Sequence, residues 1–280
     1  MKCWFITGVS RGFGLALAKA ALANGDKVIG TVRSEAPTVH DPEGRLRVLK
    51  VDMNDDEGVS AAVHQAFETL GRIDVLVNNA GYGVLGPIES STDDDLHKLF
   101  QVNVFAPIRI IRTALPYLRR QKGGHIVNIS SISGRAPGVG AGLYAATKFA
   151  LEGFTATLAR EVEPFGIKVT AVAPGQFRTD FLDAKPRQAD TADAAYGATV
   201  GAALDALYRL NHLQQGDPER AAQAILKAVA AEQPPLQLLL GADAVERARA
   251  KMRAVEEEMV RWEDVSSSTG FREAPSSNKS

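Results

Sequence analysis

Short apolar runs and longer amphipathic stretches alternate along the chain from its first residues. The apolar runs have the length of buried strands and lie at Cys3–Thr7, Lys27–Val32, Leu46–Val51, Val75–Val77, Gly124–Ser130, Lys168–Ala173 and Leu236–Leu240. Stretches with helical spacing lie between them, the first ending near Asn24 and the others at Glu57–Leu70, Thr92–Arg120, Tyr144–Glu163 and Pro218–Ala231. This alternation predicts an α/β, doubly wound Rossmann fold, with a seven-stranded parallel sheet and helices on both faces.

One domain accounts for most of the chain, because no repeat and no linker divides the pattern. We predict a dinucleotide-binding catalytic domain over residues 1–241, with a substrate loop at about 181–216, where the alternation breaks down.

Beyond that domain we predict an amphipathic C-terminal helix over 242–262 and a polar, Ser-rich tail over 263–280 that has little order beyond Phe271. Apolar residues three and four positions apart form one stripe on this helix, made by Val245, Ala248, Met252, Val255, Met259 and Trp262. We expect the stripe to dock on the chain's own helices, with a subunit interface as the alternative.

Composition and charge narrow the classes of function. The 280 residues carry a net charge of -1, which gives no reason to expect a nucleic-acid partner, and no apolar run is long enough to span a membrane. The single cysteine, Cys3, lies in an apolar strand and excludes an internal disulfide, which fits a reducing, cytoplasmic compartment. The five histidines show no paired ligand spacing, so we predict no metal site.

Tyr144 and Lys148 lie four residues apart, a spacing that puts both side chains on one face of a helix. A phenol has an unperturbed pKa of about 10, and an adjacent ammonium lowers it. Such a tyrosine suits proton transfer to or from a carbonyl or alcohol oxygen. The spacing can also arise by chance in a chain with five tyrosines, so other motifs have to decide.

Glycines follow the first predicted strand in the pattern Thr7-Gly8-x-x-x-Gly12-x-Gly14. Glycine there lets backbone N–H groups approach a pyrophosphate at the N-terminus of the next helix, whose dipole favours negative charge. The alternative is a turn that needs glycine only for a positive φ. Because the pattern lies between a strand and a helix, it favours a dinucleotide site.

Charge at the end of the second strand bears on the choice of nicotinamide cofactor. An acidic residue there would bind a ribose 2′-hydroxyl and repel a 2′-phosphate. This strand instead ends at Val32 and Arg33, and Arg11 lies in the glycine turn. Two cations favour NADP(H) over NAD(H), although the nearby Glu35 keeps NAD open and both arginines could be plain surface charges.

Together these motifs resemble those of the short-chain dehydrogenase/reductase family in its single-domain form, over about residues 3–241. The resemblance implies an NAD(P)-dependent oxidoreductase that acts on CH–OH or C=O groups, with catalytic residues Asn103, Ser131, Tyr144 and Lys148. It implies cofactor contacts from Gly8, Ser10, Arg11, Gly12, Phe13, Gly14, Arg33, Asp52, Met53, Asn79, Ala80, Gly81, Tyr144, Lys148, Pro174, Gly175 and Thr179. It also implies a homodimer or homotetramer, formed through the helices Thr92–Arg120 and Tyr144–Glu163.

Asn103 allows an inference from the sequence itself. Pro107 lies four residues later and has no N–H group, so the carbonyl of Asn103 loses its partner within the helix Thr92–Arg120 and the helix should kink. A freed carbonyl can hold a water that bridges to Lys148. The alternative is that Pro107 only bends a long helix around the core.

The segment 181–216 should shape a substrate pocket, since it follows the carboxyl end of a strand. An apolar wall could come from Tyr196, Leu204, Leu207, Tyr208 and His212, although each could equally serve ordinary helix packing. Apart from Lys185 and Arg187 the segment lacks a cation cluster, which favours an uncharged, moderately sized ketone, aldehyde or secondary alcohol over a phosphorylated substrate.

Two other classes of function remain as alternatives. The first is a catalytically silent NAD(P)-sensing binding protein of the same fold, for which the complete set Asn103, Ser131, Tyr144 and Lys148 would have no purpose. The second is a sugar-nucleotide epimerase, which would have a different glycine spacing and a larger C-terminal domain. The sequence therefore favours the oxidoreductase.

Overall fold

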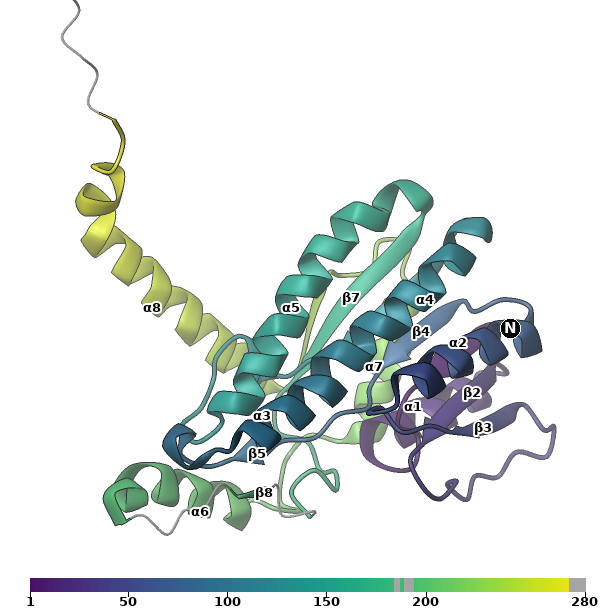
Figure 1. Cartoon of the computed structure of the whole chain (residues 1–280), viewed down its shortest axis with the longest axis horizontal. Helices are drawn as coiled ribbons and strands as arrows, with labels where there is room; N and C mark the ends of the chain where they lie inside the picture. The colour runs from purple at the N-terminus through teal and green to yellow at the C-terminus, as the bar shows by residue number, and fades with distance from the viewer. Residues whose placement is uncertain (184–186, 189–193, 272–280) are drawn as a thin grey trace, which may run out of the picture.

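A parallel sheet forms the centre of the computed structural model, which describes residues 1–183, 187–188 and 194–271. Within these residues the sheet has seven strands in the order β3-β2-β1-β4-β6-β7-β9 (Figure 1). Their bounds are Cys3–Ile6 (β1), Lys27–Val32 (β2), Leu46–Lys50 (β3), Val75–Asn78 (β4), Gly124–Ile129 (β6), Ile167–Pro174 (β7) and Gln237–Leu240 (β9). The predicted fold class is confirmed, with strand ends shifted by one residue at most.

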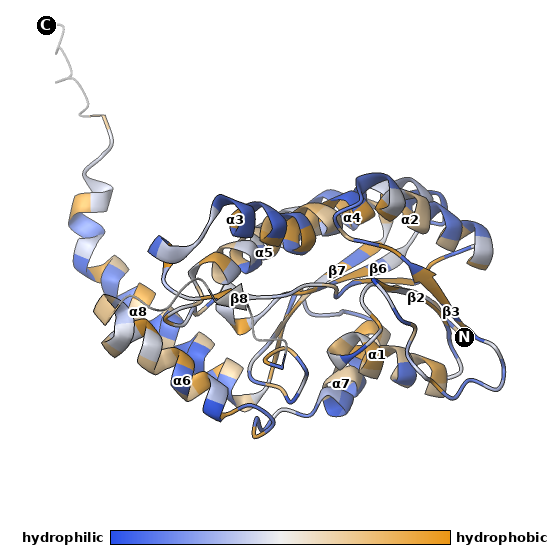
Figure 2. Cartoon of the chain, turned by 60° about the horizontal axis from the view of Figure 1, so that its bottom comes forward, coloured by the Kyte–Doolittle hydropathy of each residue, from blue (hydrophilic) through white to orange (hydrophobic). Residues whose placement is uncertain are grey.

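Helices cover both faces of this sheet (Figure 2). One face packs against α1 and α7, and the other packs against α2, α4 and α5. The helices span Gly12–Ala23 (α1), Asp56–Leu70 (α2), Asp93–Phe100 (α3), Ala106–Arg120 (α4), Gly142–Val162 (α5), Ala202–Arg209 (α6), Pro218–Ala230 (α7) and Ala242–Ser267 (α8).

Each strand of the sheet sends its side chains alternately to the two faces, and both faces are apolar. In β1 the side chains of Trp4 and Ile6 enter the core with α1 and α7, while Phe5 between them enters the core with α2, α4 and α5. Successive side chains of a strand point to opposite faces, so a strand that is buried on both sides reads as a continuous apolar run. Both faces of the sheet are therefore covered by helices, and the edge formed by the carboxyl ends of the strands stays open to ligands.

The predicted helix Thr92–Arg120 is distorted in the middle. It begins with a capping box, in which Thr92 Oγ1 accepts a hydrogen bond from Asp95 N at 3.1 Å. Between α3 and α4, residues Gln101–Phe105 form a π-helical turn, just before the proline at position 107. A proline without an N–H group accounts for the distortion. The predicted water beside the Asn103 carbonyl stays a prediction.

The C-terminal helix α8 departs from two expectations. Only its first turns are buried, at Ala244 and Ala248, and from Met252 onward its apolar side chains are exposed. The helix projects away from the rest of the chain (Figure 1). The prediction that the whole stripe docks on the chain's own helices is therefore wrong beyond Ala248. The helix also continues to Ser267, into the segment expected to be a tail, and residues 272–280 lie outside the described residues.

The substrate-loop segment folds partly into helix. Residues 194–209 form short helical turns followed by α6, and Arg187–Gln188 (β8) pairs with Val84–Leu85 (β5). Lys185 lies outside the described residues. None of the helices in the described part of the chain combines the length and the apolar run that crossing a bilayer requires.

Burial of His125 on β6 predicts a loss of stability in acid. Its Nε2 lies 2.8 Å from Thr170 Oγ1, and burial lowers the pKa of the imidazole to about 4. The unfolded chain, with a pKa near 6.5, binds a proton that the folded chain does not bind between pH 6.5 and 4. The free energy of unfolding should therefore fall by about 2 kcal/mol between pH 7 and pH 5 because of this residue alone.

Urea denaturation of the wild type and of His125→Gln at both pH values measures this effect. The variant keeps a hydrogen-bond donor toward Thr170 but does not titrate, so its stability should change by about 2 kcal/mol less than that of the wild type. Equal pH dependence of the two proteins would show that His125 is not the titrating group.

Candidate active site

A cavity of about 1220 Å³ opens at the carboxyl edge of the sheet. Ligand pockets are commonly 300–1,000 Å³, so this one has room for a dinucleotide together with a substrate. Among the residues named from the sequence, its lining includes Gly8, Ser10, Arg11, Gly12, Phe13, Arg33, Asp52, Met53, Asn79, Ala80, Gly81, Ser131, Tyr144, Lys148, Pro174, Gly175 and Thr179. Gly14 and Asn103 are not among the described residues that line the cavity.

The glycine turn between β1 and α1 needs its glycines for two different reasons. Gly8 and Gly12 have φ values of +73° and +56°, a conformation that side chains disfavour. Gly14 has an ordinary φ, but a Cβ there would lie 2.2 Å from the carbonyl oxygen of Gly8. The first glycines therefore shape the turn, and the third lets α1 pack closely against it.

The start of α1 suits a pyrophosphate. Arg11 is its N-cap residue in an extended conformation, and within the described residues no side chain caps the helix and no acid lies in its first turn. Exposed N–H groups and the helix dipole attract anions there. The buried Ser130 hydroxyl also lines the cavity, without a hydrogen-bond partner in the described part of the chain. These features fit a bound dinucleotide.

Hydrogen bonds join the turn after β1 to the turn after β4. Thr7 Oγ1 accepts from the backbone N–H groups of Asn79 at 2.9 Å and Ala80 at 3.0 Å. In return, Asn79 Nδ2 donates to the carbonyl oxygens of Thr7 at 2.9 Å and Gly8 at 3.0 Å. The Asn79 amide therefore holds the two turns against each other, and both turns contribute residues to the lining of the cavity.

Tyr144, Lys148 and Ser131 come together at the base of the cavity. Lys148 Nζ lies 5.6 Å from the centre of the Tyr144 ring and donates a hydrogen bond to the Ile129 carbonyl at 2.9 Å. Ser131 lies near enough to Tyr144 for its hydroxyl to lower the pKa of the phenol, and its Oγ accepts from Ser133 N at 3.1 Å. Helix α5 thus supplies the phenol and the ammonium, and the end of β6 supplies the hydroxyl.

Burial controls the ionisation of this group. It raises the pKa of Tyr144 to about 12, against a smaller lowering by the Ser131 hydroxyl. It lowers the pKa of Lys148 to about 8, although the carboxylate of Glu152 acts in the opposite direction. The expected lowering of the phenol pKa by Lys148 is not seen, and burial, which disfavours the phenolate, is the largest influence on Tyr144. At neutral pH the structure holds a protonated phenol beside a largely protonated ammonium.

Asn103 lies behind the cavity wall and orders it. Its Oδ1 accepts from Tyr82 N at 3.1 Å, while its Nδ2 donates to Tyr82 O at 2.9 Å and to Thr147 Oγ1 at 3.1 Å. The residue is almost fully buried in the π-helical turn. It therefore ties the segment after β4 to α5, one residue before Lys148.

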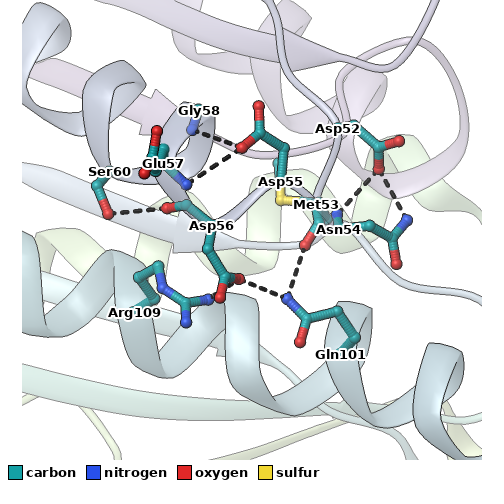
Figure 3. A network of polar contacts seen from close by, with 10 residues as sticks. All are labelled: Asp52, Met53, Asn54, Asp55, Asp56, Glu57, Gly58, Ser60, Gln101 and Arg109. Carbon is teal, nitrogen blue, oxygen red and sulfur yellow. Dashed lines mark hydrogen bonds and ion pairs between the residues drawn. The ribbon is translucent and has the colours of Figure 1, made fainter.

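A polar network fixes the loop that carries Asp52 and Met53 (Figure 3). Asp52 accepts hydrogen bonds from the backbone and side chain of Asn54 at 2.9 and 2.8 Å, and these bonds lower the pKa of its carboxyl group. Gln101 donates to the Asp56 carboxylate at 2.8 Å, and Arg109 forms an ion pair with the same carboxylate. The loop is thereby attached to the π-helical turn and to α4.

The other end of the cavity is apolar. It is lined by Leu182, Leu204, Leu207 and Leu210, and the ring of Phe181 lies 5.5 Å from the ring of Tyr144. Of the apolar wall predicted from the sequence, Leu204 and Leu207 line the cavity. Tyr196 and Tyr208 pack against these two leucines in one cluster instead of lining the cavity. His212 instead forms an ion pair with Asp183 at 2.7 Å.

Two residues of this region were not recognised as site residues from the sequence, although Phe181 begins the predicted substrate loop. Phe181 covers Tyr144, and Gly83 opposite it has room for the ring only because it lacks a side chain, since a Cβ would lie 2.7 Å from Phe181 Cζ. Arg247 on α8 lines the cavity and donates to the Ala136 carbonyl at 2.6 Å. Neither lies in a recognisable motif, and only the three-dimensional packing of distant segments brings them here.

Comparison with known proteins agrees with this geometry. The family model described as short chain dehydrogenase matches residues 2–190. The chain belongs to the short-chain dehydrogenase/reductase family. This membership makes it an NAD(P)-dependent oxidoreductase, and the sequence resemblance is confirmed.

Individual relatives cover nearly the whole chain. Oxidoreductase BOA17 of Botryotinia fuckeliana is 39% identical over 95% of this chain and 98% of its own length. A 3-ketodihydrosphingosine reductase of Bacteroides thetaiotaomicron is 36% identical over 84% of this chain and 86% of its own length. The crystal structure of a short-chain dehydrogenase from Streptomyces avermitilis is 40% identical, with a TM-score of 0.87 over 96% of this chain and 99% of that one.

Two more distant structures of the family were solved with a nicotinamide cofactor. One, from Burkholderia phymatum, is in complex with NAD and has a TM-score of 0.80 over 92% of this chain and 95% of that one. The other, from Burkholderia cenocepacia, is in complex with NADP and has a TM-score of 0.71 over 93% of this chain and 96% of that one. At 24% identity each shares the fold with this chain.

The close packing at Gly14 predicts that Gly14→Ala damages both stability and cofactor binding. The new methyl group would lie 2.2 Å from Gly8 O and 2.5 Å from Asn79 Nδ2, so the bonds between the two turns have to break or shift. Overpacking of this kind costs about 1–3 kcal/mol. Urea denaturation and a fluorescence titration with NADPH should show both losses.

The matched control is Gly153→Ala, in the middle of α5. A Cβ there has no described atom within 4 Å. Replacing a helical glycine by alanine removes a cost of up to about 1 kcal/mol, so this variant should be as stable as the wild type or more so. Unchanged stability and cofactor affinity in Gly14→Ala would contradict the packing argument.

Proposed function

We propose that this chain reduces the carbonyl group of an uncharged, moderately sized and largely apolar substrate with NADPH, and oxidises the corresponding secondary alcohol in the reverse direction. The main support is the arrangement of one cavity, with the glycine turn along one side, Tyr144, Lys148 and Ser131 at its base, and an apolar wall at the far end. A nicotinamide bound there supplies or accepts the hydride.

Tyr144 acts as the general acid of the reduction. With a pKa of about 12 its phenol is protonated at neutral pH and has a proton to give. An alkoxide that develops beside it is a strong enough base to take that proton. In the oxidative direction the same oxygen receives the proton from the alcohol.

Ser131 and Lys148 support this transfer. The Ser131 hydroxyl, which lies near Tyr144, holds the substrate oxygen, and its bond to that oxygen strengthens as negative charge develops. The Lys148 ammonium adds positive potential near the phenol and lies close to Gly81, where a Cβ would be 3.7 Å from Nζ. That position also suits a bond to the ribose hydroxyls of the cofactor.

Two arginines favour NADP(H) as the cofactor. Arg11 and Arg33 both line the cavity, and the charge of Arg33 contributes to lowering the Asp52 pKa. Glu35, which could have favoured NAD, is outside the lining that the described residues form. Structures of the same fold carry either cofactor, so the preference rests on these charges.

The apolar wall supports a substrate with a hydrophobic body. Leucines from the segment 182–210 form it, and Arg247 also lines the cavity. The relative from Bacteroides thetaiotaomicron is by name a reductase of a keto compound, which supports a ketone as the reacting group. A catalytically silent NAD(P)-binding protein is the second candidate, and turnover of any ketone excludes it.

We also propose that the enzyme assembles through the helices around α4 and α5. Phe105, in the π-helical turn, and Phe149, on α5, are about half exposed. Large exposed apolar side chains are typical of subunit contacts.

Tyr144→Phe should lower the rate of ketone reduction by NADPH by a factor of about 10²–10⁴, because the variant removes only the proton donor. Its affinity for NADPH, measured by fluorescence titration, should stay near that of the wild type. Tyr117→Phe, at a tyrosine of α4 that packs on Phe67, is the control and should keep full activity. Equal turnover by Tyr144→Phe would refute the proposed acid.

Arg33→Ala should weaken NADPH binding at least about tenfold, because a charge-assisted hydrogen bond to the 2′-phosphate contributes about 1.5–3 kcal/mol. Binding of NADH, which lacks that phosphate, should change little in the same variant. Titrations of both cofactors against both proteins measure the difference. A wild type that prefers NADH, or a variant that loses both cofactors equally, would contradict the NADP assignment.

A further inference from the structure

Helix α8 is attached to the body of the protein only at its start. Asp243 Oδ2 accepts a hydrogen bond from Gln176 N at 2.8 Å, Arg247 donates to the Ala136 carbonyl, and Ala244 and Ala248 are buried with Ile132. Beyond Ala248 every described residue of the helix is exposed, and the helix extends away from the sheet and its covering helices (Figures 1 and 2).

The projecting part carries an apolar stripe. Met252, Val255, Met259 and Trp262 have exposed fractions of 62%, 38%, 67% and 57%. Together with Val245 and Ala248 they continue the three-and-four spacing of a coiled-coil seam, as positions a and d of three heptads. An isolated helix is marginal in water and gains most of its stability from packing of its apolar face. The stripe therefore requires a partner surface.

Charge is distributed unevenly along the same helix. Its first half is net basic, with Arg247, Arg249, Lys251 and Arg253 against Asp243 and Glu246, and its second half is net acidic, with Glu256, Glu257, Glu258, Glu263 and Asp264 against Arg261. A second α8 laid alongside in the opposite direction places each basic half against an acidic half. A parallel pair would instead place like charges side by side.

We propose that α8 pairs with α8 of a second copy of this chain as an antiparallel coiled coil. In the register that the flanking charges favour, Met252 packs against the partner's Val255, and the partner's Met259 reaches the level of Ala248, which stays buried in its own chain. The two-fold symmetry repeats the contact between Met252 and Val255.

The residues that flank the seam select this register. In this register Arg249 lies beside the partner's Glu256 and Lys251 lies beside the partner's Glu258, so that both of these flanking pairs join opposite charges. A shift by one heptad in either direction would set Glu258 against the partner's Glu258 or Arg249 against the partner's Arg249. Like charges at these positions destabilise a pair.

Charge reversal tests the pairing directly. Glu256→Lys/Glu258→Lys makes all four positions 249, 251, 256 and 258 basic, and Arg249→Glu/Lys251→Glu makes all four acidic, so each variant should repel its own copies. Sedimentation velocity at micromolar concentration should show each variant at half the mass of the wild type. A one-to-one mixture of the two variants restores opposite charges at every pair and should regain the full mass.

Two results would overturn the proposal: wild-type mass for either variant alone, or failure of the mixture to regain it. Met259→Glu tests the apolar contact instead of the charges, because it places a carboxylate in the seam. This variant should also sediment at half the mass of the wild type. All these residues are exposed in the single chain, so thermal unfolding by circular dichroism should show that the catalytic domain stays folded in each variant.

Cross-linking distinguishes the two directions. In the antiparallel register the two Met259 positions are about 16 Å apart along the axis, so Met259→Cys alone should not be joined by a short bismaleimide. A mixture of Arg249→Cys and Glu256→Cys should be joined across the pair. The native Cys3 is buried and its thiol pKa is raised by burial, so it should not react. Efficient self-cross-linking of Met259→Cys would show a parallel pair and refute the antiparallel one.

Discussion

The side-chain amide of Asn79 joins the two turns on which the whole cavity depends. One turn follows β1 and starts α1, the other follows β4, and each belongs to a different strand of the sheet. The amide donates to both carbonyls of the first turn, and Thr7 accepts from the backbone of the second. Without these bonds the turns would be held only by the strands beneath them. The absence of a side chain at Gly14 is what allows the approach, because any Cβ would occupy the space of the Gly8 carbonyl.

The ionisation of Tyr144 and Lys148 at the base of the cavity depends on a balance between burial and hydrogen bonding. A buried ammonium is costly unless it is paired, and Lys148 is paired with the Ile129 carbonyl and lies under the influence of Glu152. Glu152 in turn forms an ion pair with Arg135 at 3.1 Å, so its charge is shared between two cations. Asn103 uses its complete side-chain amide to hold Tyr82 and Thr147 around the same helix. The protonated forms of Tyr144 and Lys148 at neutral pH follow from this environment.

The sequence was sufficient for the sheet, because short continuous apolar runs that alternate with longer amphipathic stretches are typical of parallel strands buried on both faces. It was also sufficient for the motifs at the strand ends, since strand order in a doubly wound fold brings those ends together. It could not show that Gln101–Phe105 forms a π-helical turn, because the proline predicts a break but not its geometry. Nor could it place Phe181 or Arg247, whose positions depend on contacts between segments far apart in the chain.

The C-terminal stripe shows the limit of such patterns most clearly. A seam of residues three and four apart establishes that one face of a helix is apolar, and it says nothing about what covers that face. The expectation of docking within the chain assumed that a nearby surface was free. The sheet is already covered on both faces by α1, α7, α2, α4 and α5, and the small cluster around Ile132 accommodates only Ala244 and Ala248. The remaining stripe is therefore available to a second molecule, and the separation of basic and acidic residues along α8 is a feature that a helix buried within its own chain would not require.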